Sequence, residues 1–490
     1  MNPWWSLYFI VSALLSLAGW LTLHPVWMFA LAILQFPKLT GWPSRLRLFV
    51  SVVVAIALVY WQADLPSVPV LVDKTKALSG FSAGYWIELF NRVDGGKWLL
   101  WLAGSLAVYW LVSTKLRMSV FALLMLGAIS WLTGSQADSR DSDNTADIAR
   151  DVEDYYQSEA SRQVMFSKKQ VGKQDVLIVQ VCSLGWADLK RFGLDKHPLW
   201  GRLDVLMPRF NSGTSYSNPA ALRLLRGTCG HPRHDDLYSD AAPSCYLGQQ
   251  LTDAGFTTDI LMNHDGQYSD FLKETVKLGR FSNSVTHYSA PVLYHGFSGS
   301  VIMDDEVMLK KWWAERSSMQ DSHATYYNTI SLHDGNTLDG QQSKTSSVES
   351  YPIRVKRLLD GLLHLFDDME ASGKKAIVVI VGEHGAALTG NAYHLEGLRD
   401  TPTPDVTLVP AGIKLIGYNN ASRAQIPSLV SYPELTALLG DALSGNPIKV
   451  PREDDTKFMA ENADKQVFGE NGSLYSRDGN EKWTRIGDWE

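Results

Sequence analysis

Long apolar segments with almost no charge fill the first 134 residues and predict a helical transmembrane domain. The first, residues 4–23, has no charged side chain and is long enough to cross a bilayer. A cleaved signal peptide fits it poorly, because no basic region precedes it and further apolar segments follow. These segments contain so little charge that the interpretation as buried helices of a soluble protein is disfavoured. The other segments raise the expected number of transmembrane helices to about five: residues 25–36, 48–61, 98–112 and 118–132.

Basic residues in the short loops predict the orientation of these helices. They lie between the second and third segments and between the fourth and fifth: Lys38, Arg45, Arg47, Lys115 and Arg117. Because such loops stay in the cytoplasm, an odd number of spans places the rest of the chain outside. The loop between the third and fourth segments has mixed charge, and its aromatic segment 81–90 is expected to lie along the membrane interface.

After residue 134 the pattern changes to that of a soluble α/β domain. Residues 135–170 are expected to be a linker, because residues 135–154 are polar, lack apolar periodicity and suit a connecting segment or a solvated helix. From 171 to 490, short apolar runs alternate with helical patterns, which predicts a largely parallel central sheet. The expected strands are residues 175–181, 256–262, 324–332, 375–381 and one or two within 406–416. The expected helices are residues 219–226, 245–254, 304–316 and 351–371, and residues 469–489 resemble a hairpin-forming extension.

Composition narrows the range of partners. The chain of 490 residues is long enough for two domains. Its net charge of −7 gives no reason to expect binding to nucleic acid. All three cysteines lie in the second part, and an odd number in an exported domain suggests one disulfide and one thiol with another role.

Cys229 and Cys245 are the pair expected to form the disulfide. They flank a loop of turn-forming residues, and closing such a loop stabilises by roughly 3 kcal/mol in the chain-entropy model. A disulfide also fits the oxidising compartment that the loop charges predict. The alternative is a zinc site formed with His231 and His234, but the spacing matches no standard zinc finger.

Polar residues at the ends of the predicted strands form a candidate catalytic site, because ligands of open α/β sheets bind at the carboxyl ends of strands. Cys182 follows the first strand, and Glu383 and His384 follow the fourth. A thiolate, a carboxylate and an imidazole form a suitable ligand set for zinc. His333 follows the third strand. Ser217 directly precedes the helix expected from residue 219, where an anion is favoured, and its hydroxyl could act as a nucleophile.

Each of these residues also has a simpler structural explanation. Cys182 could be a small buried apolar residue, and Ser217 a helix N-cap. Glu383 and His384 could lie in an exposed turn, as could His333, and Arg399 could be a surface ion-pair partner. Each explanation is the more probable one for its own residue. Together they require several coincidences at one edge of the sheet.

At these residues the chain resembles the alkaline-phosphatase-like phosphoethanolamine transferases, and among them the cellulose-modifying branch. The resemblance covers about residues 170–420 and follows a multi-span region like that of the family. Ser217 stands where lipid A-modifying relatives have Thr, Cys182 replaces an acidic ligand, and Glu383 replaces Asp. The matching segments are VCSLGWADL, FNSGTSYSNPAALRLLRGTCG, CYLGQQL, MNHDGQYSDFLKE, YYNTISLHDGN, VIVGEHGAALTG and GLRDTPTP.

The resemblance implies a role for each matching residue. Zn²⁺ would be held by Cys182, Glu383 and His384, with the nucleophile Ser217 completing the ligand set. The phosphoryl site would be lined by Tyr216, His333 and Arg399, and Cys229 and Cys245 would form the family's disulfide. His394 has no counterpart in the motif.

The resemblance also implies a multi-pass protein of the bacterial inner membrane with a periplasmic catalytic domain. The donor would be phosphatidylethanolamine, a membrane lipid, the acceptor would be cellulose, and subunits of the cellulose synthase complex would be partners. Two alternatives stay open. The same domain could act on lipopolysaccharide or another glycan, as a phosphoglycerol transferase or as a hydrolase such as a sulfatase, or the chain could be a non-enzymatic scaffold.

Overall fold

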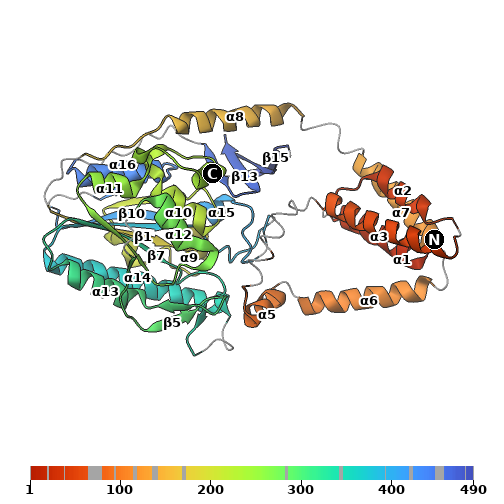
Figure 1. The fold of residues 1–490 in the computed structure, drawn as a ribbon, viewed down its shortest axis with the longest axis horizontal. Helices are drawn as coiled ribbons and strands as arrows, with labels where there is room; N and C mark the ends of the chain where they lie inside the picture. Colours follow the sequence, from red (N-terminus) through yellow and green to blue (C-terminus); the bar gives the residue numbers. More distant parts are fainter. Residues whose placement is uncertain are drawn as a thin grey trace. The chain divides into compact units, whose positions relative to one another are not determined.

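The chain folds into two compact units. The first unit comprises residues 1–79 and 90–142, and the second comprises residues 80–89 and 143–490 (Figure 1). The computed structural model describes residues 2–18, 21–37, 39–63, 75, 80–92, 95–113, 118–134, 142–167, 173–281, 285–340, 346–391, 393–394, 396–418, 423–446, 457–479 and 482–488.

The first unit consists of apolar helices. Proline occupies the first turn of the first three helices, where its missing N–H removes no helical hydrogen bond. Phe9, Met28, Leu58 and Leu126 belong to one buried apolar cluster that joins the helices. The helices are α1 (Pro3–Leu17), α2 (Pro25–Leu34), α3 (Trp42–Gln62), α6 (Gly95–Ser113) and α7 (Met118–Gly134).

Within the described residues, α3 alone is by itself long and apolar enough to cross a membrane. Helices α6 and α7 meet the criterion only as a pair bent by 118°, and α1 and α2 are shorter than a span. The structure therefore provides one or two apolar helices of sufficient length, where the sequence predicted about five. The basic residues Lys38, Lys115 and Arg117 lie outside the described residues.

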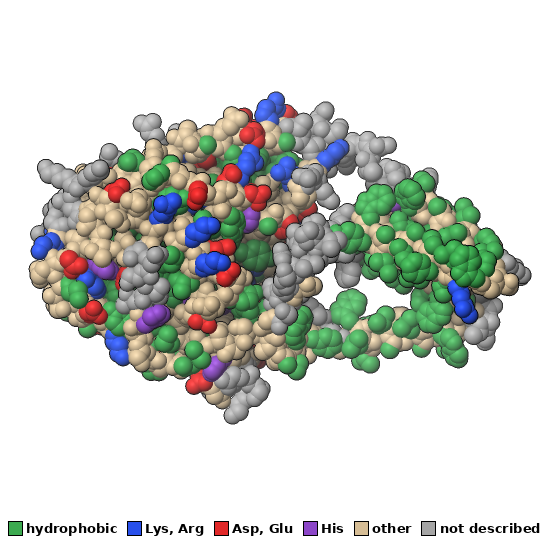
Figure 2. All heavy atoms as spheres, viewed as in Figure 1, with side chains coloured by type: hydrophobic (Ala, Val, Ile, Leu, Met, Phe, Trp, Pro, Cys, Tyr) green, Lys and Arg blue, Asp and Glu red, His purple; other side chains and the backbone are tan. Residues whose placement is uncertain are grey.

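The surface of the first unit is strongly apolar. Trp98, Leu100, Trp101 and Trp110 of α6 are each more than 60% exposed. Figure 2 shows apolar side chains gathered over these helices, whereas charged side chains gather over the second unit. Contiguous exposed apolar surface of this kind is typical of contact with a membrane or a protein partner.

The second unit is built around a mixed, mostly parallel sheet with strand order β11-β2-β10-β9-β1-β7-β3-β4. Only β10 runs antiparallel to its two neighbours, β9 and β2. The strands are β1 (Asp175–Val181), β2 (Val205–Asn211), β3 (Thr257–Met262), β4 (Val285–Thr286), β7 (His323–Thr329), β9 (Ala376–Gly382), β10 (Leu408–Ile416) and β11 (Ala424–Gln425).

Helices cover both faces of this sheet (Figure 1). Val176 and Ile178 of β1 face one apolar core, whereas Leu177 and Val179 face the other, so the strand is apolar at every position. The first core is covered by α10 (Ser217–Leu225), α11 (Leu247–Asp253), α12 (Phe271–Gly279) and α16 (Tyr432–Leu443). The second is covered by α9 (Trp186–Arg191), α13 (Asp305–Arg316) and α14 (Ser347–Ser372).

Several element boundaries differ from those expected. Strand β7 ends at Thr329, three residues before the expected end, so a turn separates it from His333. Helix α14 begins four residues early, because Ser346 and Glu349 form a capping box. Strand β2 was not anticipated, nor was the small sheet of β5 (Val292–His295), β6 (Val301–Met303) and β8 (Thr337–Leu338).

The expected linker contains a helix with an apolar face. In α8 (Ser142–Ala160), Ile148, Val152 and Tyr156 pack against Met459 and Phe468. Their spacing of four residues is helical, so the absence of periodicity inferred from the sequence was wrong. The expected C-terminal hairpin is a four-stranded antiparallel sheet of β12 (Phe458–Glu461), β13 (Lys465–Glu470), β14 (Ser473–Asp478) and β15 (Thr484–Asp488).

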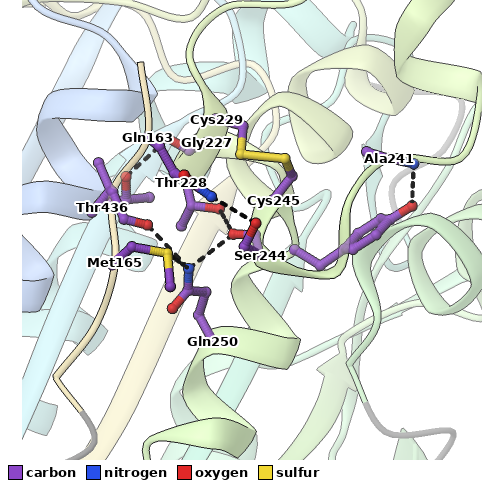
Figure 3. The surroundings of a disulfide bond; sticks show 12 residues. Gln163, Met165, Gly227, Thr228, Cys229, Ala241, Ser244, Cys245, Gln250 and Thr436 are labelled. Carbon is purple, nitrogen blue, oxygen red and sulfur yellow. Dashed lines mark hydrogen bonds between the residues drawn. A yellow bond between two sulfur atoms is a disulfide. The ribbon is translucent and has the colours of Figure 1, made fainter. Parts of the chain in front are cut away.

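A disulfide joins Cys229 to Cys245, with Cα atoms 5.0 Å apart (Figure 3). This bond excludes the alternative in which both thiols bind zinc. The bridged loop also holds the segment that follows α8. Gln163 Nε2 donates to Ser244 Oγ at 2.7 Å, and Gln250 Nε2 donates to the Ser244 carbonyl at 2.8 Å (Figure 3).

Removing this disulfide should lower the free energy of unfolding. The cysteines are 16 residues apart, and closing a loop of that length stabilises by about 3 kcal/mol in the chain-entropy model. We expect the variant with Cys229→Ser and Cys245→Ser to unfold at a lower temperature, measured by circular dichroism. Reductant should lower the transition of the wild type and leave that of the variant unchanged. Equal transitions for both proteins would contradict the prediction.

Candidate active site

The side chains of Cys182, Glu383 and His384 converge at one edge of the central sheet. Their ligand atoms lie within 4.8 Å of one another, and all three residues are fully buried. Burying a thiol, a carboxyl and an imidazole together without a compensating cation is unfavourable. These residues therefore form a group that could hold a metal ion.

Strand register explains this convergence. Strands β1 and β9 are parallel neighbours, with Val181 paired to Gly382. Cys182 directly follows β1 and Glu383 directly follows β9, so the two residues lie side by side where the strands end. Parallel strands present their carboxyl ends at the same edge, as expected from the sequence.

Ser217 is brought to the same point by the start of a helix. It is the first residue of α10, with Tyr216 at the N-cap, so the helix begins two residues earlier than expected and Ser217 is not the N-cap. Ser217 Oγ lies 3.4 Å from Cys182 Sγ and 3.3 Å from His384 Nε2. The helix N-terminus favours negative charge at this hydroxyl and on a group bound to it.

The distances fit the size of a zinc ion. Cys182 Sγ lies 3.8 Å from His384 Nε2, which lies 3.9 Å from Glu383 Oε2. Tetrahedral zinc with bonds of about 2.0–2.3 Å separates its ligand atoms by about 3.3–3.8 Å. Within the described part of the chain, the buried Glu383 Oε2 has no hydrogen-bond partner. The donor set and this unsatisfied oxygen both fit a metal cation.

Neighbouring groups orient the two ligands that follow β9. His384 Nδ1 donates to the Gly385 carbonyl at 2.8 Å, and because a carbonyl only accepts, Nε2 keeps its lone pair for a metal. Asn328 Nδ2 donates to Glu383 Oε1 at 2.6 Å, which leaves Oε2 as the free oxygen. Asn328 was not among the residues expected at the site, although it lies within the predicted third strand.

Burial sets the protonation states of the three ligands. It raises the pKa of the Cys182 thiol to about 12, with a further contribution from the Glu383 charge. Burial also raises the pKa of Glu383 to about 7. The pKa of His384 is held well below its usual range, first by burial and then by the positive charge of Arg399. A divalent cation reverses the effect on the thiol and carboxyl because it favours their charged forms.

Asp188 joins the loop after β1 to the loop after β9. Its carboxylate accepts N–H bonds from Ala386 at 2.6 Å and Leu388 at 2.9 Å. The loops approach so closely that a Cβ on Gly185 would lie 2.6 Å from Gly385 Cα. Asp188 is part of the matching VCSLGWADL segment, but its spacing gave no sign of this contact.

Tyr216 directly precedes Ser217, and Arg399 contacts the loop that leads to it. Arg399 Nε donates to the Ser215 carbonyl at 3.0 Å, and its guanidinium lies 6.0 Å from the Tyr216 ring centroid. The Tyr216 hydroxyl donates to Asp400 Oδ1 at 2.5 Å. Burial, followed by the Asp400 charge, raises the pKa of Tyr216, so this side chain stays a neutral hydrogen-bond donor.

His333 is held as a neutral imidazole. Its Nδ1 donates to the Asp334 carbonyl at 2.5 Å, which leaves Nε2 able to accept a proton. Burial and then the charge of Arg399 lower the pKa of His333 to about 4. Its ring packs against Phe297, with centroids 4.9 Å apart.

Part of the aromatic segment 81–90 lies beside His333. Tyr85, in helix α5 (Ala83–Arg92), donates its hydroxyl to Asp334 Oδ2 at 2.7 Å, and the Ser82 N–H donates to the Phe297 carbonyl at 2.9 Å. The neighbouring Trp86 and Ile87 remain 45% and 63% exposed. The segment expected along the membrane interface therefore contacts the second unit and also exposes large apolar side chains.

His394 takes no part in the ligand cluster. Its Nε2 lies 3.0 Å from Asp405 Oδ2 and 2.8 Å from Asn391 Nδ2. It belongs to the loop before α15 (Pro404–Thr407), and these contacts hold that loop.

Zinc affinity should rise with pH. Below about pH 7, metal binding must displace one proton from Glu383 and one from Cys182. Above pH 7, Glu383 is already ionised, and metal binding displaces only the Cys182 proton. His384 stays neutral and does not compete. The dissociation constant should therefore fall about 100-fold per pH unit below pH 7 and about 10-fold above it. Competition with a fluorescent chelator on the full-length protein in detergent measures this.

The matched variant for that experiment is Glu383→Gln, which removes one of the two titrating groups. Its dissociation constant should fall about 10-fold per pH unit on both sides of pH 7. A dissociation constant independent of pH in the wild type would contradict binding through the Cys182 thiolate.

The α/β domain has an alkaline-phosphatase-like fold. A solved structure of a protein in the alkaline phosphatase superfamily from Vibrio parahaemolyticus matches with a TM-score of 0.50 and 14% sequence identity. The match covers 68% of this chain and 86% of that one. At this identity the likeness concerns the fold alone.

Sequence comparisons identify the family. The model of the cellulose biosynthesis protein BcsG N-terminal domain matches residues 5–131, and that of the C-terminal domain matches residues 133–485. BcsG of Escherichia coli K12 is 31% identical over 89% of this chain and 85% of its own. BcsG of Salmonella typhimurium LT2 is 30% identical over 96% and 94%. With both domains matched, this chain belongs to the family of the cellulose biosynthesis protein BcsG.

Proposed function

We propose that this protein transfers phosphoethanolamine from phosphatidylethanolamine to glucose hydroxyls of nascent cellulose, through a covalent intermediate on Ser217. The observation that carries the proposal is the position of Ser217 Oγ, 3.4 Å from Cys182 Sγ and 3.3 Å from His384 Nε2. A serine hydroxyl is a weak nucleophile at neutral pH. The buried group of Cys182, Glu383 and His384 supports an activating cation beside it.

Zinc is the cation that these residues suit best. Thiolate and imidazole ligands favour zinc over magnesium or calcium, which prefer oxygen. When bound, zinc supplies a Lewis acid that stabilises the ionised Ser217 hydroxyl and the phosphoryl oxygens. Cys182, Glu383 and His384 would hold the ion, and Ser217 would be its fourth ligand, as in catalytic zinc sites.

The reaction is two in-line substitutions at phosphorus. In the first, Ser217 Oγ gives up its proton and forms a bond to phosphorus, the bond from phosphorus to the glycerol oxygen breaks, and that oxygen takes up a proton as diacylglycerol leaves. In the second, a glucose hydroxyl oxygen gives its proton to His333 and attacks phosphorus, the bond to Ser217 Oγ breaks, and Ser217 Oγ takes up a proton. Two inversions give net retention of configuration at phosphorus.

Residues around Ser217 suit the charges and protons of these steps. Arg399 would hold the phosphoryl oxygens, and Tyr216, whose hydroxyl proton is donated to Asp400, would line the site beside it. His333, with Nδ1 fixed on the Asp334 carbonyl, has Nε2 free to take the proton of the glucose hydroxyl. Its low pKa keeps it unprotonated at neutral pH.

The first unit would hold the catalytic unit at its lipid donor. The apolar surface of α3 and α6 supports a multi-pass domain within residues 1–134, followed by a linker at 135–170 and a periplasmic catalytic domain at 171–490. The disulfide fits the periplasm of a bacterial inner-membrane protein. The family name supports cellulose as acceptor and cellulose synthase subunits as partners.

Replacing the nucleophile should abolish the covalent intermediate. We expect the full-length protein with zinc and phosphatidylethanolamine to gain one phosphoethanolamine on Ser217, detected by mass spectrometry, and Ser217→Ala to gain none. Ser239→Ala, at an exposed serine of the same unit, should react as the wild type does. Inversion at phosphorus with a chiral donor would contradict the covalent mechanism.

Replacing His333 should separate the two steps. His333→Gln should still form the adduct, because the first step does not need this base, and should release it to a soluble glucan about 10²- to 10⁴-fold more slowly. Rapid-quench mass spectrometry of the adduct measures the release. His287→Gln, at an exposed histidine, is the matched control. Wild-type release by His333→Gln would remove His333 from the mechanism.

A further inference from the structure

The C-terminal sheet lies directly against the loop that carries the nucleophile. Glu461 N–H, at the end of β12, donates to the Gly213 carbonyl at 3.0 Å. Its side chain pairs with Arg223 of α10 at 3.0 Å, with both side chains no more than 3% exposed. Asn211 Nδ2 donates to the Met459 carbonyl at 2.8 Å. The strand β12 is therefore bound to the start of the loop before Ser217 and to the helix that follows it.

Asn462, the next residue, uses its whole side-chain amide to join two loops. Its Oδ1 accepts from Thr214 Oγ1 at 2.9 Å and from Ser215 N–H at 3.2 Å. Its Nδ2 donates to Ser215 Oγ at 2.9 Å and to the Asp400 carbonyl at 2.7 Å. An amide offers two donors and one accepting oxygen, so these four bonds satisfy it.

The orientation of this amide is fixed by its backbone partners. Ser215 N–H can only donate, so it must face Oδ1, and the Asp400 carbonyl can only accept, so it must face Nδ2. Asn462 is 3% exposed, so water cannot easily replace these bonds. Each of them therefore contributes to holding the two loops together.

The joined loops carry the nucleophile and the arginine. Ser215 lies two residues before Ser217, and Asp400 directly follows Arg399. Ser215 Oγ accepts from Asn462 and donates to the Arg399 carbonyl at 2.5 Å, which makes a continuous chain from amide to hydroxyl to carbonyl. Arg399 Nε donates to the Ser215 carbonyl at 3.0 Å, which makes a second hydrogen bond between these two residues.

We propose that Asn462 is a positioning residue that sets the distance between the Ser217 nucleophile and the Arg399 guanidinium. This rests on the proposed function, in which both groups act on one phosphoryl group. Asn462 does not contact the ligand group of Cys182, Glu383 and His384, so its loss should disturb the reaction and leave zinc binding intact. The C-terminal sheet thereby gains a role in catalysis.

The decisive variant is Asn462→Asp. A carboxylate keeps the two accepted bonds, cannot donate to Ser215 Oγ, and repels the Asp400 carbonyl. We expect kcat for adduct formation to fall about 10- to 100-fold, with KM for the lipid changed less than about threefold and zinc content unchanged. Val467→Ala is the control, because Val467 is fully buried in the same sheet and belongs to an apolar cluster that includes no residue of either loop. It should lower the melting temperature and keep the wild-type kcat.

Hydrogen exchange of the full-length protein provides a second measurement that does not depend on activity. Exchange should rise in segments 212–217 and 398–402 for Asn462→Asp, and in neither segment for Val467→Ala. The proposal would be overturned if Asn462→Asp kept the kcat and the hydrogen exchange of the wild type. It would also be overturned if Asn462→Asp and Val467→Ala lost kcat equally. If wild type forms no Ser217 adduct while exchange rises in both segments, the proposed function fails and the joining of the loops by Asn462 stands.

Discussion

The pairing of β1 with β9 is the interaction on which the candidate active site depends. Both strands are buried on both faces, and their parallel register places Val181 beside Gly382. That register delivers Cys182 and Glu383 to one point. A shift by one residue would turn one of these side chains to the opposite face of the sheet and separate the ligands. Apolar packing on both faces thus fixes the geometry of a polar site.

Contacts from distant parts of the chain then complete the site around these two strands. The start of α10 brings Ser217, Asp188 holds the loop after β9, and Asn462 ties the nucleophile loop to that of Arg399. These supports are buried hydrogen bonds to backbone groups, which define positions more tightly than exposed side-chain contacts do. The proposed reaction at one phosphorus would require such precision, because nucleophile and charge-stabilising groups must be aligned together.

The first and second units differ in the character of their surfaces, which suits the proposed lipid donor and polysaccharide acceptor. The first unit exposes large apolar side chains, whereas the second buries its apolar residues in two cores around the sheet. Helix α5 has both characters, because Tyr85 binds Asp334 next to His333 and Trp86 remains exposed. An amphiphilic helix beside a candidate base fits chemistry carried out near a membrane surface.

The α/β pattern, the apolar N-terminal part and the polar residues at strand ends were predictable from the sequence, because buried parallel strands leave continuous apolar runs and their polar ends share one edge. The sequence also indicated the pairing of Cys229 with Cys245, which the structure contains. Only the tertiary structure revealed Asn328 and Asn462 and the face of α8 that packs on the C-terminal sheet. Such contacts join segments far apart in the chain, and local periodicity can indicate an apolar helix face but not the segment that the face packs against. Helix lengths in the first unit also differed from expectation, because hydropathy marks apolar residues and not where a helix ends.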